Sequence, residues 1–215
     1  IKEINIKLSR GETSAPGLLP HYERLKQSPF IFNVDFGLNE LPTEPGILLV
    51  RGARQYGKST WLEQMIFLTI QEFGPGSAYY LNGETIDSPD TLENEIDQLV
   101  QAFPKQASVC RIFIDEITAI ADWEIALKRM ADRGKLQNIL IVTTGSKATD
   151  LRRGSERLPG RKGRLARTNY LFTPISYQAF HEVSAKKLGV DTLTSYLLSG
   201  GSPIACSELT THGII

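Results

Sequence analysis

The chain has 215 residues, and its 24 Lys and Arg residues balance its 24 Asp and Glu residues, so the formal net charge is zero at pH 7. This balance excludes a polyanion-coating protein. Hydrophobic residues make up 41% and charged residues 22% of the chain, which excludes disordered and collagen-like classes. The length suffices for one full hydrophobic core and predicts one main domain.

Two cysteines, Cys110 and Cys206, are too few for a disulfide scaffold and lack metal-ligand spacing. The three histidines, His21, His181 and His212, are also far apart in the sequence. No apolar stretch approaches the roughly 20 residues that a membrane-spanning helix needs. We therefore expect a soluble, cytoplasmic protein without a membrane partner.

The pattern of apolar residues along the chain predicts three parts, which are an N-terminal lead-in, an α/β core and a C-terminal region. Residues 1–45 form the lead-in, with alternating apolar residues at Ile4, Ile6 and Leu8 and a short helix near 21–27. The core, 46–180, has predicted strands at 47–50, 78–81, 111–114, 139–142 and 169–172, with helices at 60–73, 90–103 and 123–133. Residues 181–215 begin a helical or C-terminal region. Strands that alternate with helices imply a parallel sheet covered on both faces.

Directly after the first predicted strand, the chain reads Gly-Ala-Arg-Gln-Tyr-Gly-Lys-Ser, which fits the phosphate-loop pattern G-x-x-x-x-G-K-[ST]. Its position between a strand and a helix makes a chance glycine turn the weaker interpretation. Backbone amides would surround the phosphates, Lys58 would reach the β and γ phosphates, and Ser59 would give its hydroxyl to Mg²⁺. The predicted nucleotide-binding residues are Gly52, Ala53, Arg54, Gln55, Tyr56, Gly57, Lys58, Ser59 and Thr60.

Two carboxylates, Asp115 and Glu116, follow the third predicted strand. The carboxyl edge of a parallel sheet is where ligands bind. We expect Asp115 to hold the Mg²⁺ shell and Glu116 to orient or deprotonate the water that attacks the γ-phosphate. The alternative is that both acids only begin a helix, where they favour its dipole.

The fourth predicted strand is followed at the same edge by hydroxyl residues, among which Thr144 and Ser146 are the candidate γ-phosphate sensors. Helix capping or a turn is the competing interpretation of these residues. The following stretch, 146–150, only approximates a guanine-recognition element and is one residue too long, so ATP is preferred over GTP.

A strongly basic segment lies between Leu151 and Thr168, with seven basic residues against Glu156. Arg161 or Arg164 would stabilise charge on the transferred phosphoryl group. A solvated loop and nucleic-acid contact are the alternatives. Residues 84–97 are conversely acidic, so complementary patches would permit head-to-tail contacts in a homo-oligomer.

Together these residues resemble the AAA-like, STAND-related ATPases of archaea and bacteria, whose members carry a DUF4143-like or nuclease-like C-terminal region. The resemblance lies in 51–60, 114–117, 123–124, 127–128, 144–146, 158–161, 171–177 and 200–203. It implies a three-layer P-loop NTPase fold with an additional strand, the ASCE type, and strand order 5-1-4-3-2. It also favours Arg161 as the charge-sensing arginine.

Two departures from the family pattern stand out. Pro174-Ile175-Ser176-Tyr177 replaces the family's Pro-Leu-Ser-Phe. Family members also continue well beyond the Gly-Gly-x-Pro element, here Gly200–Pro203, so the chain is expected to be the N-terminal half of a longer protein.

The sequence thus predicts an ATP-driven, Mg²⁺-dependent molecular switch that hydrolyses ATP. A nucleotide-dependent module that docks DNA or a protein partner, with little hydrolysis, is the alternative. A small-molecule kinase ranks below both because no acceptor pocket or lid is recognisable and the paired acids favour water as the acceptor.

Overall fold

Five strands form one parallel sheet in the computed structural model, which describes residues 2–146, 163 and 165–213. The strands are β1 (Gly46–Arg51), β2 (Ala78–Asn82), β3 (Arg111–Asp115), β4 (Leu140–Gly145) and β5 (Asn169–Leu171). Their spatial order is β2-β3-β4-β1-β5, with all neighbours parallel. Counted from the other edge, this is the predicted order 5-1-4-3-2, so the predicted fold class is confirmed.

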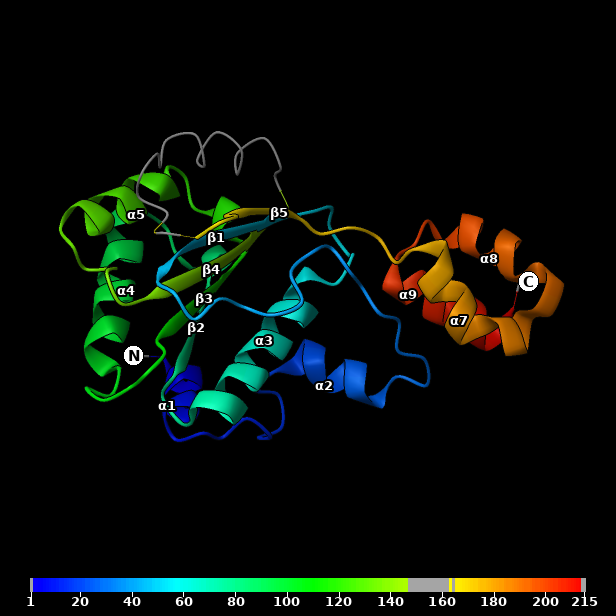
Figure 1. The fold of residues 1–215 in the computed structure, drawn as a ribbon, viewed down its shortest axis with the longest axis horizontal. Helices are drawn as coiled ribbons and strands as arrows, with labels where there is room; N and C mark the ends of the chain where they lie inside the picture. The colour runs from blue at the N-terminus through cyan, green and yellow to red at the C-terminus, as the bar shows by residue number, and fades with distance from the viewer. Residues whose placement is uncertain (1, 147–162, 164, 214–215) are drawn as a thin grey trace.

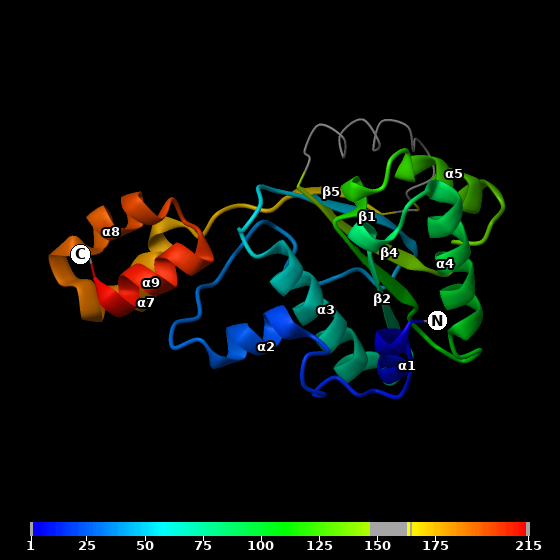
Figure 2. The ribbon, with the colours of Figure 1, turned by 180° about the vertical axis from the view of Figure 1, so that it is seen from behind.

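Helices cover both faces of this sheet (Figure 1). One face carries α1 (Glu3–Ser9), α2 (Pro20–Gln27) and α3 (Lys58–Phe73), and the other carries α4 (Pro89–Ala102) and α5 (Trp123–Asp132). The short 3₁₀ helices η1 (Gly83–Thr85) and η2 (Ile117–Ala119) follow β2 and β3. A separate helical group at one end of the molecule contains α7 (Tyr177–Leu188), η3 (Gly189–Asp191), α8 (Thr192–Ser199) and α9 (Pro203–His212), as Figure 2 also shows.

The central strands are rich in apolar residues because both of their faces are buried. In β1, Ile47 and Leu49 belong to the cluster that packs against α4 and α5, whereas Leu48 and Val50 belong to the cluster that packs against α3. This alternation follows the two-residue period of a strand. Because β1, β4 and β3 run parallel, their carboxyl ends lie at one edge of the sheet.

The N-terminal segment packs onto this core through a helix, although its apolar residues alternate. In α1, Leu8 is buried and Ile6 is exposed. The helical period places Asn5 and Leu8 on one side, towards β2. The Asn5 side chain donates to the Tyr80 carbonyl oxygen at 2.8 Å and accepts from the Tyr80 amide at 2.7 Å. Asn5 thus supplies the edge strand with the hydrogen bonds that a sixth strand would otherwise make.

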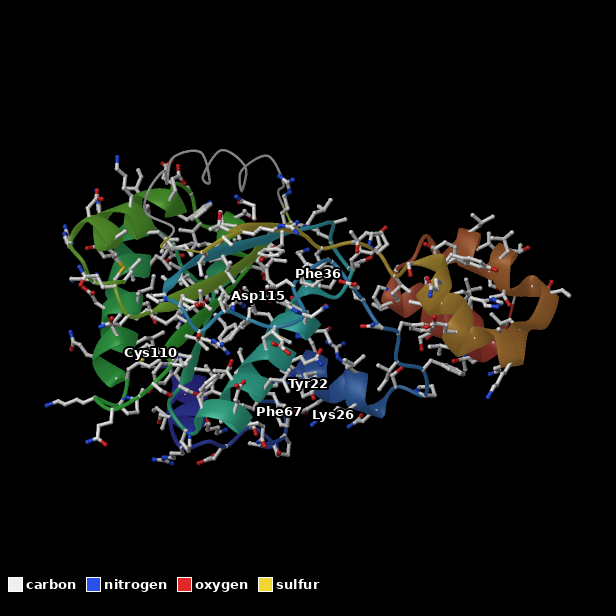
Figure 3. The ribbon with its side chains drawn as sticks, in the orientation of Figure 1. Tyr22, Lys26, Phe36, Phe67, Cys110 and Asp115 are labelled. Atoms are coloured by element: carbon white, nitrogen blue, oxygen red, sulfur yellow. The ribbon has the colours of Figure 1, made fainter. Side chains whose placement is uncertain are left out.

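A buried carboxylate on α3 fixes the start of α2. Glu63 accepts hydrogen bonds from the backbone amides of His21 at 2.8 Å and Tyr22 at 2.9 Å, and lies 2.7 Å from the His21 ring nitrogen Nδ1. Tyr22 also packs on Phe67 with ring centroids 5.2 Å apart, and Lys26 lies over both rings (Figure 3). The lead-in is therefore held against α3 by polar and aromatic contacts.

The acidic stretch of α4 is paired within the chain. Ion pairs join Asp90 of α4 to Arg129 of α5, and Glu93 and Asp97 of α4 to Arg133 and Lys135, which follow α5. Each of these partly exposed pairs contributes little stability by itself. These three carboxylates already have cationic neighbours without a second protomer.

Within the described part of the chain, no helix combines the length and the apolar composition needed to cross a membrane.

Replacing Asn5 with Ala should lower the free energy of unfolding by about 1–3 kcal/mol, because the Tyr80 amide and carbonyl lose their partner at a half-buried edge. Urea unfolding at neutral pH measures this change. Asn39→Ala, at an exposed position, is the matched control and should change stability by less than about 0.5 kcal/mol. Equal effects of the two substitutions would contradict the role given to Asn5.

Candidate functional site

The loop Gly52–Ser59 joins β1 to α3 and has the backbone geometry of an anion-binding loop. Gln55 has φ +66° and Gly57 has φ +97°, both in the left-handed region, and no side chain caps the helix that starts at Lys58. The first amides of α3 are therefore open to an anion, and the positive end of the 16-residue helix points at the same place.

Lys58 is buried in this loop, with 6% of its surface exposed. Its Nζ donates to the carbonyl oxygens of Gly52 at 2.9 Å and Ala53 at 2.8 Å. Burial lowers the pKa of Lys58, and the charges of Glu116 and Asp115 oppose this change while that of Arg54 adds to it. Among the residues that the structure describes, no carboxylate forms an ion pair with Lys58. A buried ammonium group in this state is suited to an anionic ligand.

The paired carboxylates meet β4 through one hydroxyl. Thr144 donates to the Asp115 carboxylate, and its oxygen accepts the Glu116 backbone amide at 3.0 Å. Thr144 is fully buried. This hydroxyl thus donates to one residue of the carboxylate pair and accepts from the other.

The Glu116 side chain is fixed by three hydrogen bonds to one oxygen. Oε1 accepts from the Thr118 hydroxyl at 2.7 Å, the Ser146 hydroxyl at 2.7 Å and the Ser146 amide at 2.9 Å. Burial alone would raise the pKa of Glu116, but the hydrogen bonds from Ser146 and Thr118 and the charge of Lys58 leave that pKa below its ordinary value. Glu116 is therefore a carboxylate near neutral pH.

A glycine that the sequence interpretation missed lies against the backbone of Glu116. A Cβ on Gly83 would be 2.5 Å from the Glu116 carbonyl oxygen and 3.1 Å from that of Asp115. Gly83 directly follows β2, which pairs with β3, so the absence of a side chain lets the two strand ends approach. No motif in the sequence indicates this position, because the contact depends on the pairing of β2 with β3.

A pocket with a volume of about 900 Å³ opens from the phosphate loop. Beyond the loop, an apolar part of its wall comes from two distant parts of the chain, the stretch 30–34 before β1 and the residues Ile175, Pro203 and Ile204. Polar and charged side chains of α2, α3 and α9 line other parts of the pocket. The sequence interpretation assigned no ligand contact to either part. Apolar walls beside a polar anion site are typical of pockets for small organic ligands.

The helical group reaches the phosphate loop through the Gly-Gly-Ser-Pro element. The Tyr56 hydroxyl lies 3.4 Å from the Gly200 carbonyl oxygen, and a Cβ on Gly57 would be 3.6 Å from Pro203. Gly201 is packed so closely that a Cβ would lie 2.7 Å from the Ile175 carbonyl oxygen. This element therefore places the start of α9 beside the phosphate loop.

Most of the predicted site residues lie together at this edge of the sheet. Glu116 and the loop residues from Arg54 to Thr60 line the pocket, and Asp115 ends β3 near the middle of the molecule (Figure 3). Arg161 and Arg164 lie outside the described residues. Among the residues that the structure describes, no three His, Cys, Asp or Glu side chains form a metal-binding group. Asp115 and Ser59 nevertheless supply the hard oxygen donors that suit Mg²⁺, which commonly keeps several waters.

A sheet in this order, with a phosphate loop after β1 and two carboxylates after β3, defines the class of P-loop NTPases. The family model of the AAA domain matches residues 44–181, so the chain belongs to the AAA domain family. No curated protein matches the chain. None of these comparisons shows a DUF4143-like region.

Several solved structures share the fold at 14% sequence identity. They include ORC1 of Aeropyrum pernix in complex with DNA, with a TM-score of 0.52 over 93% of this chain and 62% of that one. A RuvB mutant of Thermotoga maritima has a TM-score of 0.51 over 77% of this chain and 53% of that one. A DNA polymerase III γ subunit-related protein of T. maritima has a TM-score of 0.50 over 77% and 54%. The chain thus spans less than two thirds of the length of these structures.

The lowered pKa of Glu116 predicts a specific pH dependence of stability. Its contribution is fully present above the ordinary pKa of 4.5 and is lost as pH falls through the lower folded-state pKa. Unfolding free energies of wild type and Glu116→Gln, measured by urea titration from about pH 7 to about pH 3, should differ by a constant amount above 4.5. Below it, the wild type should lose stability relative to the variant. A relative gain of the wild type on acidification would mean that burial outweighs the hydrogen bonds.

Proposed function

We propose that this chain binds ATP with Mg²⁺ and hydrolyses the bond to the γ-phosphate. The observation that carries the proposal is the Glu116 carboxylate, held by three hydrogen bonds at the edge of the sheet that also bears the phosphate loop. A phosphate loop alone supports binding. A fixed, charged carboxylate beside it supports activation of water.

The phosphate end of ATP would bind the amides of the loop and the start of α3, as these groups are not capped by a side chain. Lys58 would exchange its bonds to the Gly52 and Ala53 carbonyls for bonds to the β and γ phosphates. Ser59 and Asp115 would hold Mg²⁺, and Thr144 would keep the Asp115 carboxylate oriented. Bound Mg²⁺ supplies electrostatic stabilisation of charge on the phosphate oxygens.

The attacking water would donate a hydrogen bond to Glu116. As the water oxygen bonds to the γ-phosphorus, the bond from that phosphorus to the bridging oxygen breaks and ADP leaves. The water proton passes to the Glu116 carboxylate, whose lowered pKa keeps it ionised before the reaction. Ser146 would lie between Glu116 and the γ-phosphate, as the sensor that the sequence predicts, because its hydroxyl and amide already contact Glu116.

The base of ATP would bind the apolar part of the pocket, between the stretch 30–34 and Ile175, Pro203 and Ile204. These walls belong to both the core and the helical group. Nucleotide binding would therefore change how the two parts contact each other, which is the physical basis of the proposed switch. We also place the protein in the cytoplasm, because the thiols of Cys110 and Cys206 are unpaired.

A nucleotide-dependent binding module with little intrinsic hydrolysis is the alternative. It is favoured by the ORC1 structure, which was determined in complex with DNA. The basic segment of this chain, which would make such a contact, lies outside the described residues. A change in ATP affinity on addition of duplex DNA would support this alternative, and equal affinity with and without DNA would count against it.

Replacing Lys58 with Ala should abolish ATP binding and turnover, whereas Glu116→Gln should preserve binding and reduce turnover by about 10²-fold or more. Gln keeps the size of the side chain and removes the base. ATP affinity and phosphate release, measured for wild type and both variants with Mg²⁺, test this. Normal turnover by Glu116→Gln would refute the role assigned to Glu116. Binding without turnover in the wild type would favour the alternative above.

Gly83→Ala should reduce turnover by about 10- to 100-fold while ATP affinity is retained, since the new methyl group displaces the backbone of Glu116. Gly74→Ala is the matched control, because its Cβ meets no atom within 4 Å although its φ of +86° makes the substitution strained. The control should lose stability but not turnover. Wild-type turnover by Gly83→Ala would show that the Glu116 backbone position is not critical.

A further inference from the structure

Arg54 is a cation of the phosphate loop to which the sequence pattern assigns no specific role. It is the third residue of the loop, its side chain is exposed, and it lines the pocket together with Lys58 and Glu116. The loop pattern accepts any residue type at this position. A guanidinium group here is therefore a property of this chain rather than a requirement for binding a nucleotide.

The Arg54 side chain extends from the loop towards the carboxylate side of the site. Its Nε lies 3.4 Å from the Ser146 hydroxyl oxygen, and that hydroxyl donates to Glu116 at 2.7 Å. At 3.4 Å the Arg54 contact is long for a hydrogen bond, so a stronger acceptor would easily replace it. The guanidinium thus spans the space between the phosphate loop and the side where water would attack.

Arg54 and Lys58 are two cations of one loop that both line the pocket. The charge of Arg54 is one of the causes that lower the pKa of Lys58. Among the described residues, no ion pair joins Arg54 to a carboxylate. Like charges held close together are unfavourable unless an anion lies between them. The Arg54 guanidinium and the Lys58 ammonium group are therefore suited to a ligand whose negative charge lies close to both of them.

We propose that Arg54 binds the γ-phosphoryl group in cis and makes the site selective for a nucleoside triphosphate over a diphosphate. This inference rests on the proposed ATP binding. The planar guanidinium offers several donors that match phosphate oxygens, and it leaves the weak contact to Ser146 when the γ-phosphate is present. The β-phosphate, in contrast, is held by the loop amides and Lys58, so a diphosphate does not need Arg54.

Arg54 differs from the other arginines considered for this site. Arg24 also lines the pocket, but it lies on α2 and its Nε donates to the Pro20 carbonyl oxygen at 3.3 Å. Arg161 lies outside the described residues, and its role stays a prediction. Only Arg54 among the described arginines combines a position in the loop with a contact to Ser146.

The test compares the affinities of a non-hydrolysable ATP analogue and of ADP, both with Mg²⁺, by calorimetric titration. The proteins are wild type, Arg54→Ala, Arg54→Lys and the control Arg10→Ala, which removes the same charge at the exposed end of α1. Arg54→Ala should weaken the analogue by about 10- to 100-fold and ADP by less than about threefold. Arg54→Lys should restore part of the preference, and Arg10→Ala should match the wild type.

Each other result overturns the inference. Equal weakening of both nucleotides by Arg54→Ala would mean that Arg54 only maintains the shape of the loop, and unchanged affinities would mean that it does not touch the γ-phosphate. Because the analogue is not hydrolysed, the result does not depend on whether the chain is an active ATPase. A wild type that bound neither nucleotide would refute the proposed function, and this inference with it.

Discussion

The hydroxyl of Thr144 joins the carboxyl ends of β3 and β4, and the geometry of the whole site depends on this contact. Through it the Asp115 carboxylate and the Glu116 amide are fixed relative to the next strand, although neither residue lies on that strand. A buried hydroxyl that satisfies two polar groups at once has no freedom to turn away, since either group would then lose its partner. The positions of Asp115 and Glu116 are thus fixed by a contact to a neighbouring strand of the sheet.

Close backbone packing brings the other parts of the site to the same edge. Gly52, Gly83 and Gly201 each lie where a Cβ would be less than 3.0 Å from a carbonyl oxygen of another segment. These contacts link the phosphate loop to the chain after β5, the end of β2 to the end of β3, and the helical group to the segment before α7. Glycine is needed at these positions because the neighbours are backbone atoms, which move only if a whole strand or loop moves.

The site brings together charges of both signs from two segments. Lys58 and Arg54 come from the loop, and Asp115 and Glu116 come from the end of β3. Lys58 is bonded to carbonyl oxygens, and Glu116 is bonded to hydroxyl and amide groups, so the opposite charges are held apart by separate partners. The positive groups of such a site are available to a phosphate, and the negative groups are available to a metal ion.

Local sequence patterns were enough to predict the sheet and the edge that carries the phosphate loop. The apolar runs predicted the strands of the described residues, since strands buried on both faces are rich in apolar side chains. The loop pattern with Asp115 and Glu116 indicated the edge because strand ends are local features. Alternation at Ile4, Ile6 and Leu8 did not indicate the helix α1, which packs against β2. Only the tertiary structure showed the need for glycine at position 83, the apolar walls of the pocket and the place of Arg54 beside Ser146. Each of these depends on distances between segments far apart in the chain, and such distances are set by packing rather than by any local pattern of residues.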